Sequence, residues 1–427
     1  MTRLRLLTSG ESHGPALSGV LDGLPAGMPV STDEVNRDLW RRQQGYGAGL
    51  RMTIEQDAVS WTAGIRFGRT LGSPVGFTIP NRDWEKWTRR MSVEQIPVED
   101  QPKPIVMARP GHADLAGAIK YDTDDIRDVL ERASARSTAP RVAAGAICRQ
   151  LLAACGVRIW SFADQMGTIR AFPDTIDTAE AVERVPAGWQ ARDRVEPSPL
   201  RCPDPAAEAE MIALVDDCKA KGDTIGGSFI VVAEGMPIGV GSNAEWDQRL
   251  DAQLAGAVMG IQAVKGVEIG IGFGVVERRG TAVHDEVIPG EPGWRRRTNR
   301  AGGTEGGMSN GAPIIVRAAV KPVATLLRPL DSVNLLDGTS ERAHIERSDV
   351  AILPRAAVVG EMTVAFILAD AILATFGGDT LGDLLAAVDR RRERSRGPRG
   401  ERRVHGTGDI LPDNAAEAAR PVPGADA

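Results

Sequence analysis

Two short segments place a histidine among glycines, arginines and carboxylates. The first is Gly10–Gly14 (GESHG), which contains His13, and the second is Arg109–Asp114 (RPGHAD), which contains His112. Histidine can give or take a proton near neutral pH, and arginine offers a rigid fork of donors that suits phosphate or carboxylate. Because the whole chain has only five histidines, these two settings indicate proton transfer on an anionic substrate. The alternative for each is a histidine that has only a structural place in a turn.

A series of arginines follows the second histidine at intervals of four or five residues: Arg127, Arg132, Arg136 and Arg141. One interpretation is a solvated helix face with local ion pairs, such as Arg127 with Glu131. The other is a ligand-binding face, because the small side chains of residues 133–135 would let a flat ligand approach between the arginines. The sequence leaves both interpretations open.

Three further segments could bind an anion or a planar cofactor. Asn299–Gly311 is rich in glycine and could cradle a phosphate with its backbone N–H groups. Lys321–Thr325 places a cation beside a turn, and Arg347–Asp349 places a guanidinium and a carboxylate two residues apart, on one face of an extended chain. The alternative for each segment is an ordinary surface turn.

Composition bounds the class of protein. The chain has 427 residues, of which 42% are hydrophobic and 25% charged, and a net charge of -6, so no overall basic field recruits nucleic acid. Its four cysteines show no metal-like spacing, which is typical of reduced thiols in a cytoplasmic protein. No N-terminal apolar stretch is long enough for a signal peptide. The apolar segment 356–376 contains Glu361 and Asp370 and is expected to be a buried helix rather than a membrane span.

Short apolar runs and glycine-rich turns predict many strands with helices between them. The expected strands are Leu4–Leu7, Ala16–Leu21, Thr53–Trp61, Val75–Ile79, Ser228–Ala233, Val267–Val276 and Pro313–Val320. The expected helices are Thr32–Gln44 with Ser31 as its cap, Ile126–Arg136, Arg141–Ala154, Ala206–Lys221, Asp247–Ile261 and Ala356–Thr375. Because strands and helices do not alternate regularly, the predicted class is α+β rather than a doubly wound sheet.

Two turns resemble one another. Asp22–Gly27 (DGLPAG) and Glu234–Gly239 (EGMPIG) each follow an expected strand and come shortly before a helix. They are either a coincidence between two glycine- and proline-containing turns or the trace of two halves with a common plan.

The composition changes near residue 390. Residues 390–403 are rich in arginine, and residues 409–427 are rich in alanine, proline and acidic residues. We therefore expect a catalytic domain over residues 1–389 and a solvated, disordered tail over residues 390–427. An RNA-binding arm is the alternative, although the negative net charge argues against nucleic acid as the main partner.

Together these segments resemble the chorismate synthase family. The matching stretches occur in the family's order and are Gly10–Gly27, Arg41–Met52, Asn81–Trp87, Arg109–Tyr121, Leu130–Ala146, Gly260–Gly270, Asn299–Gly311, Lys321–Thr325 and Arg347–Asp349. The resemblance implies a β–α–β sandwich with an internal duplication, usually assembled as a homotetramer. It also implies a cytoplasmic lyase of the shikimate pathway for aromatic amino acid biosynthesis. That lyase converts 5-enolpyruvylshikimate 3-phosphate to chorismate and phosphate by a 1,4-anti elimination with reduced FMN.

The resemblance also implies residue roles. His112 would protonate the departing phosphate, His13 would protonate or stabilise the reduced flavin, and Asp349 would assist proton removal. Substrate phosphate and carboxylates would bind to Arg42, Arg109, Arg136 and Arg347. The FMN site would consist of Arg132, Ala133, Ser134, Gln262, Ala263, Gly306, Lys321, Pro322, Val323, Ala324, Thr325 and Arg347. NADP is assigned in the family to the positions of Arg42 and Ala48, and no metal is implied.

Two positions depart from the family's pattern. Ala48 stands where the family has an arginine after Gly45–Gly47, and Ser137 stands where it has a glutamate after Arg136. The loss of the arginine puts a substrate contact and the NADP contact in doubt, although Arg51 is close in sequence. An external flavin reductase is therefore an expected partner, with NADPH as the possible alternative reductant.

Two rival functions remain at this stage. A non-catalytic anion- or RNA-binding homologue is suggested by Ala48 and the arginine-rich tail, whereas the retained His13, His112 and Asp349 favour the enzyme. A phosphatase is less favoured, because the sequence shows neither a metal cluster nor a Ser-His-Asp order.

Overall fold

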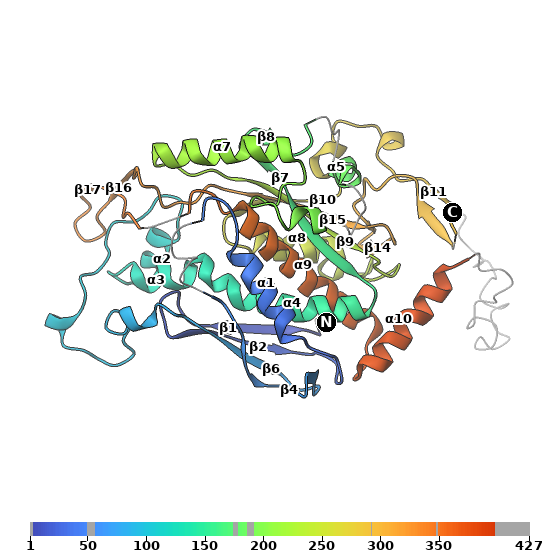
Figure 1. Cartoon of the computed structure of the whole chain (residues 1–427), viewed down its shortest axis with the longest axis horizontal. Helices are drawn as coiled ribbons and strands as arrows, with labels where there is room; N and C mark the ends of the chain where they lie inside the picture. The colour runs from blue at the N-terminus through green and yellow to red at the C-terminus, as the bar shows by residue number, and fades with distance from the viewer. Residues whose placement is uncertain are drawn as a thin grey trace, which may run out of the picture.

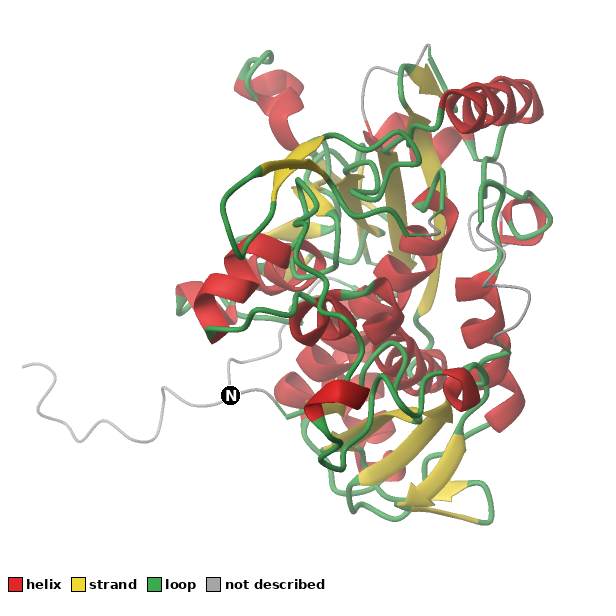
Figure 2. Ribbon diagram, turned by 90° about the vertical axis from the view of Figure 1, so that its left-hand side faces the viewer, coloured by secondary structure: helices red, strands yellow, loops and turns green. Residues whose placement is uncertain are grey.

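The structure, a computed structural model, describes residues 3–48, 56–173, 178–185, 192–291, 293–346 and 349–397. Two antiparallel sheets lie on opposite sides of a layer of helices, as Figure 1 shows with one sheet below and one above that layer. The view turned by 90° shows the same three layers (Figure 2). The predicted α+β class is confirmed.

The first sheet has the order β1-β2-β6-β3. Its strands are β1 Arg5–Ser9, β2 Ala16–Asp22, β6 Val75–Pro80 and β3 Ser60–Ala63. Alternate residues of β2, among them Leu17 and Leu21, are buried, because one face of the strand packs on the helices.

The second sheet has the order β10-β15-β9-β7-β8. Its strands are β10 Val264–Ile269, β15 Ile314–Val320, β9 Gly227–Glu234, β7 Arg158–Met166 and β8 Ile169–Arg170. The central strands are buried along nearly their whole length, because a second apolar cluster covers their outer face. That burial explains the continuous apolar run in β9.

Four helices lie between the sheets: α1 Thr32–Gln43, α4 Thr138–Ala154, α8 Leu250–Met259 and α9 Leu353–Phe376. α4 and α9 pack closely, since a Cβ added at Gly145 of α4 would lie 2.3 Å from the carbonyl oxygen of Met362 in α9. α9 is long and apolar enough to cross a membrane, but most of it is buried inside the protein. The expected core helix is thus confirmed.

The remaining elements surround these layers. The outer helices are α2 Asp114–Tyr121, α3 Arg127–Ala133, α5 Thr178–Arg184, α6 Arg192–Val195, α7 Pro205–Lys221 and α10 Leu381–Ser395. The short hairpins are β4 Ile65–Arg66 with β5 Arg69–Thr70, β11 Val287–Pro289 with β12 Trp294–Arg296, β13 Thr304–Glu305 with β14 Met308–Ser309, and β16 Asp331–Val333 with β17 Ser340–Arg342.

The expected duplication appears in the strand order. In chain order, β1, β2, β3 and β6 of the first sheet correspond to β7, β9, β10 and β15 of the second, and the spatial orders β1-β2-β6-β3 and β7-β9-β15-β10 are the same. The two similar turns occupy equivalent places. Gly23 after β2 has φ +96° and Gly235 after β9 has φ +84°, and a Cβ at either would lie within 2.3 Å of a backbone carbonyl oxygen.

Several predicted boundaries are wrong. The helix expected over Ile126–Arg136 ends at Ala133, because Ser134 is extended and its side chain caps the next turn by accepting from Arg136 N. The strand expected over Val267–Val276 ends at Ile269, where Gly270 and Gly272 take positive φ.

The other differences concern single elements. The helix expected from Asp247 begins at Leu250. The strand expected over Thr53–Trp61 lies partly outside the described residues, and its described part forms β3 from Ser60. The boundary expected at residue 390 falls inside α10, whose Arg391 and Arg392 donate to the carbonyl oxygens of Ile238 and Gly235. Residues 398–427 lie outside the described part of the chain.

Candidate active site

The His13 loop connects β1 to β2 and is held by the last turn of α3. The Glu131 carboxylate accepts hydrogen bonds from the backbone N–H of His13 at 2.8 Å and from His13 Nδ1 at 2.8 and 3.0 Å. The Glu131 carbonyl accepts from Ser12 N at 3.2 Å, and Arg132 donates to Gly10 O at 3.1 Å. Backbone and side chain of one helical turn thus fix both the loop and the imidazole ring.

Trp87 covers one face of the His13 ring. The two rings stack with centroids 3.8 Å apart and an interplanar angle of 26°. The guanidinium of Arg127 lies 5.1 Å from the Trp87 ring centroid and donates to Glu131 at 3.1 Å. Both His13 and Trp87 line a hollow of about 1200 Å³ that also contains His344 and Glu346.

The His112 turn lies at the start of α2. His112 Nδ1 is hydrogen-bonded to the Asp114 carboxylate, and Arg109 donates to the same carboxylate from Nε at 2.8 Å and from Nη2 at 3.1 Å. Burial alone would raise the pKa of Asp114, but the hydrogen bonds from His112 and Arg109 outweigh it and hold that pKa well below its usual range. Asp114 therefore stays ionised and orients His112.

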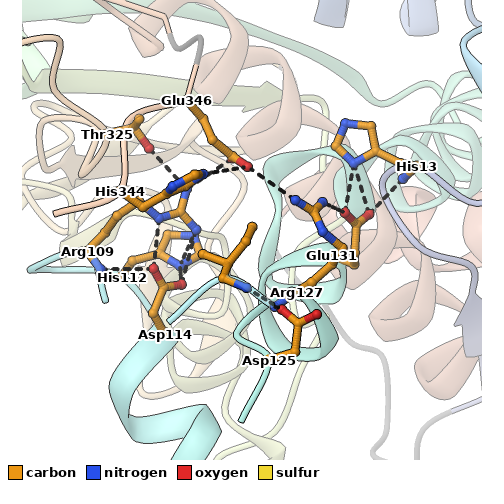
Figure 3. Close-up of polar contacts among 11 residues, drawn as sticks. His13, Arg109, His112, Asp114, Asp125, Arg127, Glu131, Thr325, His344 and Glu346 are labelled. Carbon is orange, nitrogen blue, oxygen red and sulfur yellow. Dashed lines mark hydrogen bonds and ion pairs between the residues drawn. The ribbon is translucent and has the colours of Figure 1, made fainter. Parts of the chain in front are cut away.

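One carboxylate joins the two histidine segments. Glu346 accepts from Arg109 Nη1 at 3.4 Å and lies 4.0 Å from Arg127 Nη2. The side-chain contacts form one continuous series, shown in Figure 3. It runs from His112 through Asp114, Arg109, Glu346, Arg127 and Glu131 to His13.

Two buried arginines form a second wall of the site. Arg42 of α1 and Arg136 both bind Asp57, Arg42 at 3.3 Å, and Arg136 also donates to Asn81 Oδ1 at 2.8 Å. Asn81 Nδ2 in turn donates to Gly14 O at 2.7 Å, which ties Arg136 to the His13 loop. Burial lowers the pKa of Arg42 to about 10, with Arg136 adding to the effect and Asp57 opposing it. Two adjacent cations with one shared carboxylate suit an anionic ligand.

A cavity of about 170 Å³ opens beside this wall. Its lining includes Arg42, Ser134, Arg136, Gln262, Asp349 and Arg355. Asp349 pairs with Arg355 at 2.8 Å. Gln262 Nε2 donates to Ser137 Oγ at 2.8 Å, whereas Gln262 Oε1 and Arg355 Nε are buried without a hydrogen-bond partner among the described residues. An unpaired buried acceptor and donor at one cavity are costly unless a ligand or water satisfies them.

The segment Lys321–Thr325 connects the cavity to the His112 turn. Lys321 N donates to Ala263 O at 2.9 Å, and Lys321 Nζ binds Gly111 O. Thr325 Oγ1 accepts from Arg109 Nη1 at 3.1 Å. Burial, together with nearby Lys265, lowers the pKa of Lys321. Ala263 has φ +70°, a strained conformation for a residue with a side chain that is typical of functional sites.

The structure brings together most of the residues predicted for the site. Gly306 is an exception. It lies in the β13–β14 turn near the start of α8, whereas Gln262 follows the end of α8, and the helix between them is about 15 Å long. Arg347, Ser348 and Arg51 lie outside the described residues. Ala48 is exposed, next to Gly47, whose carbonyl accepts from Val350 N at 2.9 Å.

Several residues of the site were absent from the prediction: Asp57, Asn81, Trp87, Glu131, Glu346 and Arg355. Asn81, Trp87 and Glu131 fall inside stretches that match the family, which is a signal that could have found them. Glu131 was considered only as the partner of Arg127 on a solvated face. That ion pair exists, but Glu131 is 2% exposed and faces His13. Asp57 and Glu346 carry no local sequence signal.

Comparisons with known proteins all point to one family. The family model described as chorismate synthase matches residues 4–373. A chorismate synthase of Thermobifida fusca (strain YX) is 51% identical over 386 residues, which cover 89% of this chain and 96% of that protein. One of Symbiobacterium thermophilum is 50% identical over 390 residues, 90% of this chain and 97% of that protein. A solved structure described as a crystal structure of chorismate synthase aligns with a TM-score of 0.74 at 38% identity, over 93% of this chain and 99% of that one.

Proposed function

The chain belongs to the chorismate synthase family, and from this premise we propose that it converts 5-enolpyruvylshikimate 3-phosphate to chorismate and phosphate with reduced FMN. Membership makes it a lyase of the shikimate pathway for aromatic amino acid biosynthesis. The observation that best supports the finer reaction is the continuous network between His13 and His112. It has an imidazole oriented by a carboxylate at each end and the arginines Arg109 and Arg127 between them.

The elimination breaks the C–O bond at C3 and the C–H bond at C6. The electron pair of the C–H bond provides the new double bond, and the pair of the C–O bond leaves with the phosphate. His112, oriented by Asp114, would protonate the departing phosphate, whose second pKa of about 6 suits an imidazole. Asp349, paired with Arg355 at the cavity, would assist removal of the proton. Arg42, Arg109, Arg136 and Arg347 would hold the substrate's phosphate and carboxylates.

The residues at the 170 Å³ cavity fit a flavin ring. The unpaired acceptor Gln262 Oε1 suits a ring N–H group, and the unpaired donor Arg355 Nε suits a ring oxygen. The cavity is smaller than the roughly 300–1,000 Å³ of a typical ligand pocket, so it accounts for one part of the cofactor. Reduced FMN would supply electron density for loss of the phosphate.

The other residues proposed for the FMN site follow from the family. Arg132, Ala133 and Ser134, Ala263 and the segment Lys321–Thr325 lie on elements that border the two histidine segments and the cavity. Gly306 lies apart from them, so its role is proposed from the family alone.

Other properties are proposed from the family rather than from geometry. They are a cytoplasmic location, a homotetrameric assembly, no membrane or nucleic-acid partner, and reduction of FMN by an external reductase. Ala48 weighs against a bound NADPH as the reductant. A catalytic domain is proposed for residues 1–389, and we propose that the rest of α10 packs with it, because Arg391 and Arg392 donate to backbone carbonyl oxygens of that domain.

The test is anaerobic turnover of 5-enolpyruvylshikimate 3-phosphate with chemically reduced FMN, followed by chorismate absorbance and phosphate release. We expect equal amounts of both products, none with oxidised FMN, and a loss of at least a hundredfold in kcat for His112→Ala. His284→Ala, a change at an exposed histidine, is the matched control and should leave kcat unchanged. No product from the wild-type protein despite FMN binding would overturn the proposal.

A further inference from the structure

Glu131 combines two features that a helix-surface carboxylate does not have. It is 2% exposed, and its carboxylate accepts from two donors of one residue, the backbone N–H and Nδ1 of His13. Its charge is balanced by Arg127 at 3.1 Å. Such partners offset the cost of burying a carboxylate away from water.

We propose that Glu131 is a positioning residue that fixes the tautomer and the orientation of His13, an inference that rests on the role proposed for His13 from the family, to protonate or stabilise the reduced flavin. A carboxylate accepts a hydrogen bond and cannot donate one, so the neutral imidazole must carry its proton on Nδ1. The other ring nitrogen, Nε2, points away from Glu131 and is then the one that takes up and gives the proton in the reaction (Figure 3). A carboxylate that holds a histidine in this way is a recurrent device for setting which nitrogen does the chemistry.

The packing of Trp87 on the ring does not select between the two tautomers of His13. Trp87 stacks on one face of the imidazole with ring centroids 3.8 Å apart. This stacking restricts tilting of the ring but is compatible with both ring orientations that a 180° flip interchanges. Stacking is insensitive to which nitrogen carries the proton. The hydrogen bond to Glu131 does distinguish the two tautomers, because the carboxylate needs the proton on Nδ1.

The loop has other anchors that do not use the Glu131 side chain. Ser12 N donates to the Glu131 carbonyl at 3.2 Å, Arg132 donates to Gly10 O at 3.1 Å, and Asn81 donates to Gly14 O at 2.7 Å. A substitution that keeps the size of Glu131 and removes its charge therefore leaves the loop in place. This separation allows the positioning role to be measured apart from a structural one.

The experiment compares wild-type protein with Glu131→Gln and with Asp128→Asn, a control on an exposed residue of the same helix. For Glu131→Gln we expect kcat to fall 10- to 100-fold while KM for the substrate changes less than threefold, because the arginines that bind substrate are untouched. Asp128→Asn should change kcat less than twofold. The proposal would be overturned if kcat of Glu131→Gln stayed within twofold of the wild-type value. It would also be overturned if KM rose by the same factor as kcat fell.

A second measurement does not depend on turnover. The nitrogen chemical shifts of ¹⁵N-histidine-labelled protein report the tautomer of each ring, and His13→Ala identifies the His13 signal. We expect the Nδ1–H tautomer in the wild type and a mixture in Glu131→Gln. An Nε2–H tautomer in the wild type contradicts the inference even if Glu131→Gln fails to fold. Absence of turnover with the expected tautomer contradicts the proposed function instead.

Discussion

Arg109 Nη1 lies 3.4 Å from Glu346 Oε2, a contact between residues 237 positions apart that connects the His112 turn to the His13 loop. Glu346 also pairs with His344 and lies near Arg127. The hydrogen bond from His344 lowers the pKa of Glu346, with Arg109 and Arg127 adding to the effect against its burial. A single ionised carboxylate thus sits between two cations that would otherwise repel each other.

Replacing Glu346 by glutamine should therefore disturb both histidine segments at once. Arg109 keeps Asp114 and Arg127 keeps Glu131, so the fold should persist while the distance between the two cations increases. We expect kcat/KM to fall about tenfold, which corresponds to about 1.4 kcal/mol. Glu341→Gln, at an exposed site in the same part of the chain, is the control. A loss of less than twofold in anaerobic turnover would show that the two segments work independently.

Asp114 should make the free energy of unfolding depend on pH in the acidic range. Its pKa is lowered in the folded protein, so in acid the unfolded state binds more protons there and stability falls as the pH falls. The contribution is complete above the ordinary aspartate pKa of about 3.9 and is lost as the pH decreases toward the folded-state value. Urea unfolding between pH 7 and pH 3 should give a flatter pH dependence below pH 4 for Asp114→Asn. Parallel curves for the two proteins would contradict this assignment.

Gly111→Ala should impair activity through the turn that carries His112. Gly111 has φ +79°, where an added side chain costs about 1 kcal/mol of folding free energy, and its Cβ would lie 3.4 Å from Lys321 Nζ. Gly27→Ala is a matched control, because Gly27 has φ +78° and no atom within 4 Å of an added Cβ. Both variants should lose similar stability in urea, and only Gly111→Ala should lose kcat, by about tenfold or more. Equal kcat in the two variants would exclude a role for this turn.

Ala48→Arg should strengthen substrate binding. Ala48 is exposed, and its neighbour Gly47 is hydrogen-bonded to Val350, next to Asp349 of the cavity. One added hydrogen bond to a charged group contributes about 1.5–3 kcal/mol, so KM should fall about tenfold or more with kcat within twofold. Ala206→Arg, which adds the same charge at an exposed site on α7, should leave KM unchanged. An unchanged KM for Ala48→Arg would indicate that other residues already supply this contact.

Local patterns predicted the elements whose burial follows one face. Ser31 was expected to cap the helix from Thr32, and it accepts from Glu34 N at 3.3 Å. α7 ends at Gly222, as expected, with a left-handed cap.

β7 was not predicted, because Ser161, Asp164 and Gln165 interrupt its apolar pattern. Ser161 is nevertheless fully buried, since it donates to the buried Glu361 carboxylate at 2.9 Å. Tertiary partners of that kind leave no trace in the neighbouring sequence.

The candidate site was predictable where its residues lie in short segments with a characteristic spacing. His13, His112 and the arginines of 109–136 meet this condition. Glu346 and Asp57 do not, because each acts through contacts with residues far away in the chain, such as Asp57 with Arg136 across 79 positions. Their charges are visible in the sequence, but their burial beside cations is a property of the fold alone.

The matching strand order of the two sheets has an evolutionary consequence. The connection from β1 to β2 is short and carries His13, whereas the equivalent connection from β7 to β9 holds β8, α5, α6 and α7. After a gene duplication, one copy could keep the demanding loop while the other was released from selection on that loop and accepted insertions. Such a history would place the connection from β7 to β9 under weaker selection than the connection from β1 to β2, in line with their different lengths. Insertions and fusions introduced between β7 and β9 should be tolerated where the same changes between β1 and β2 are not.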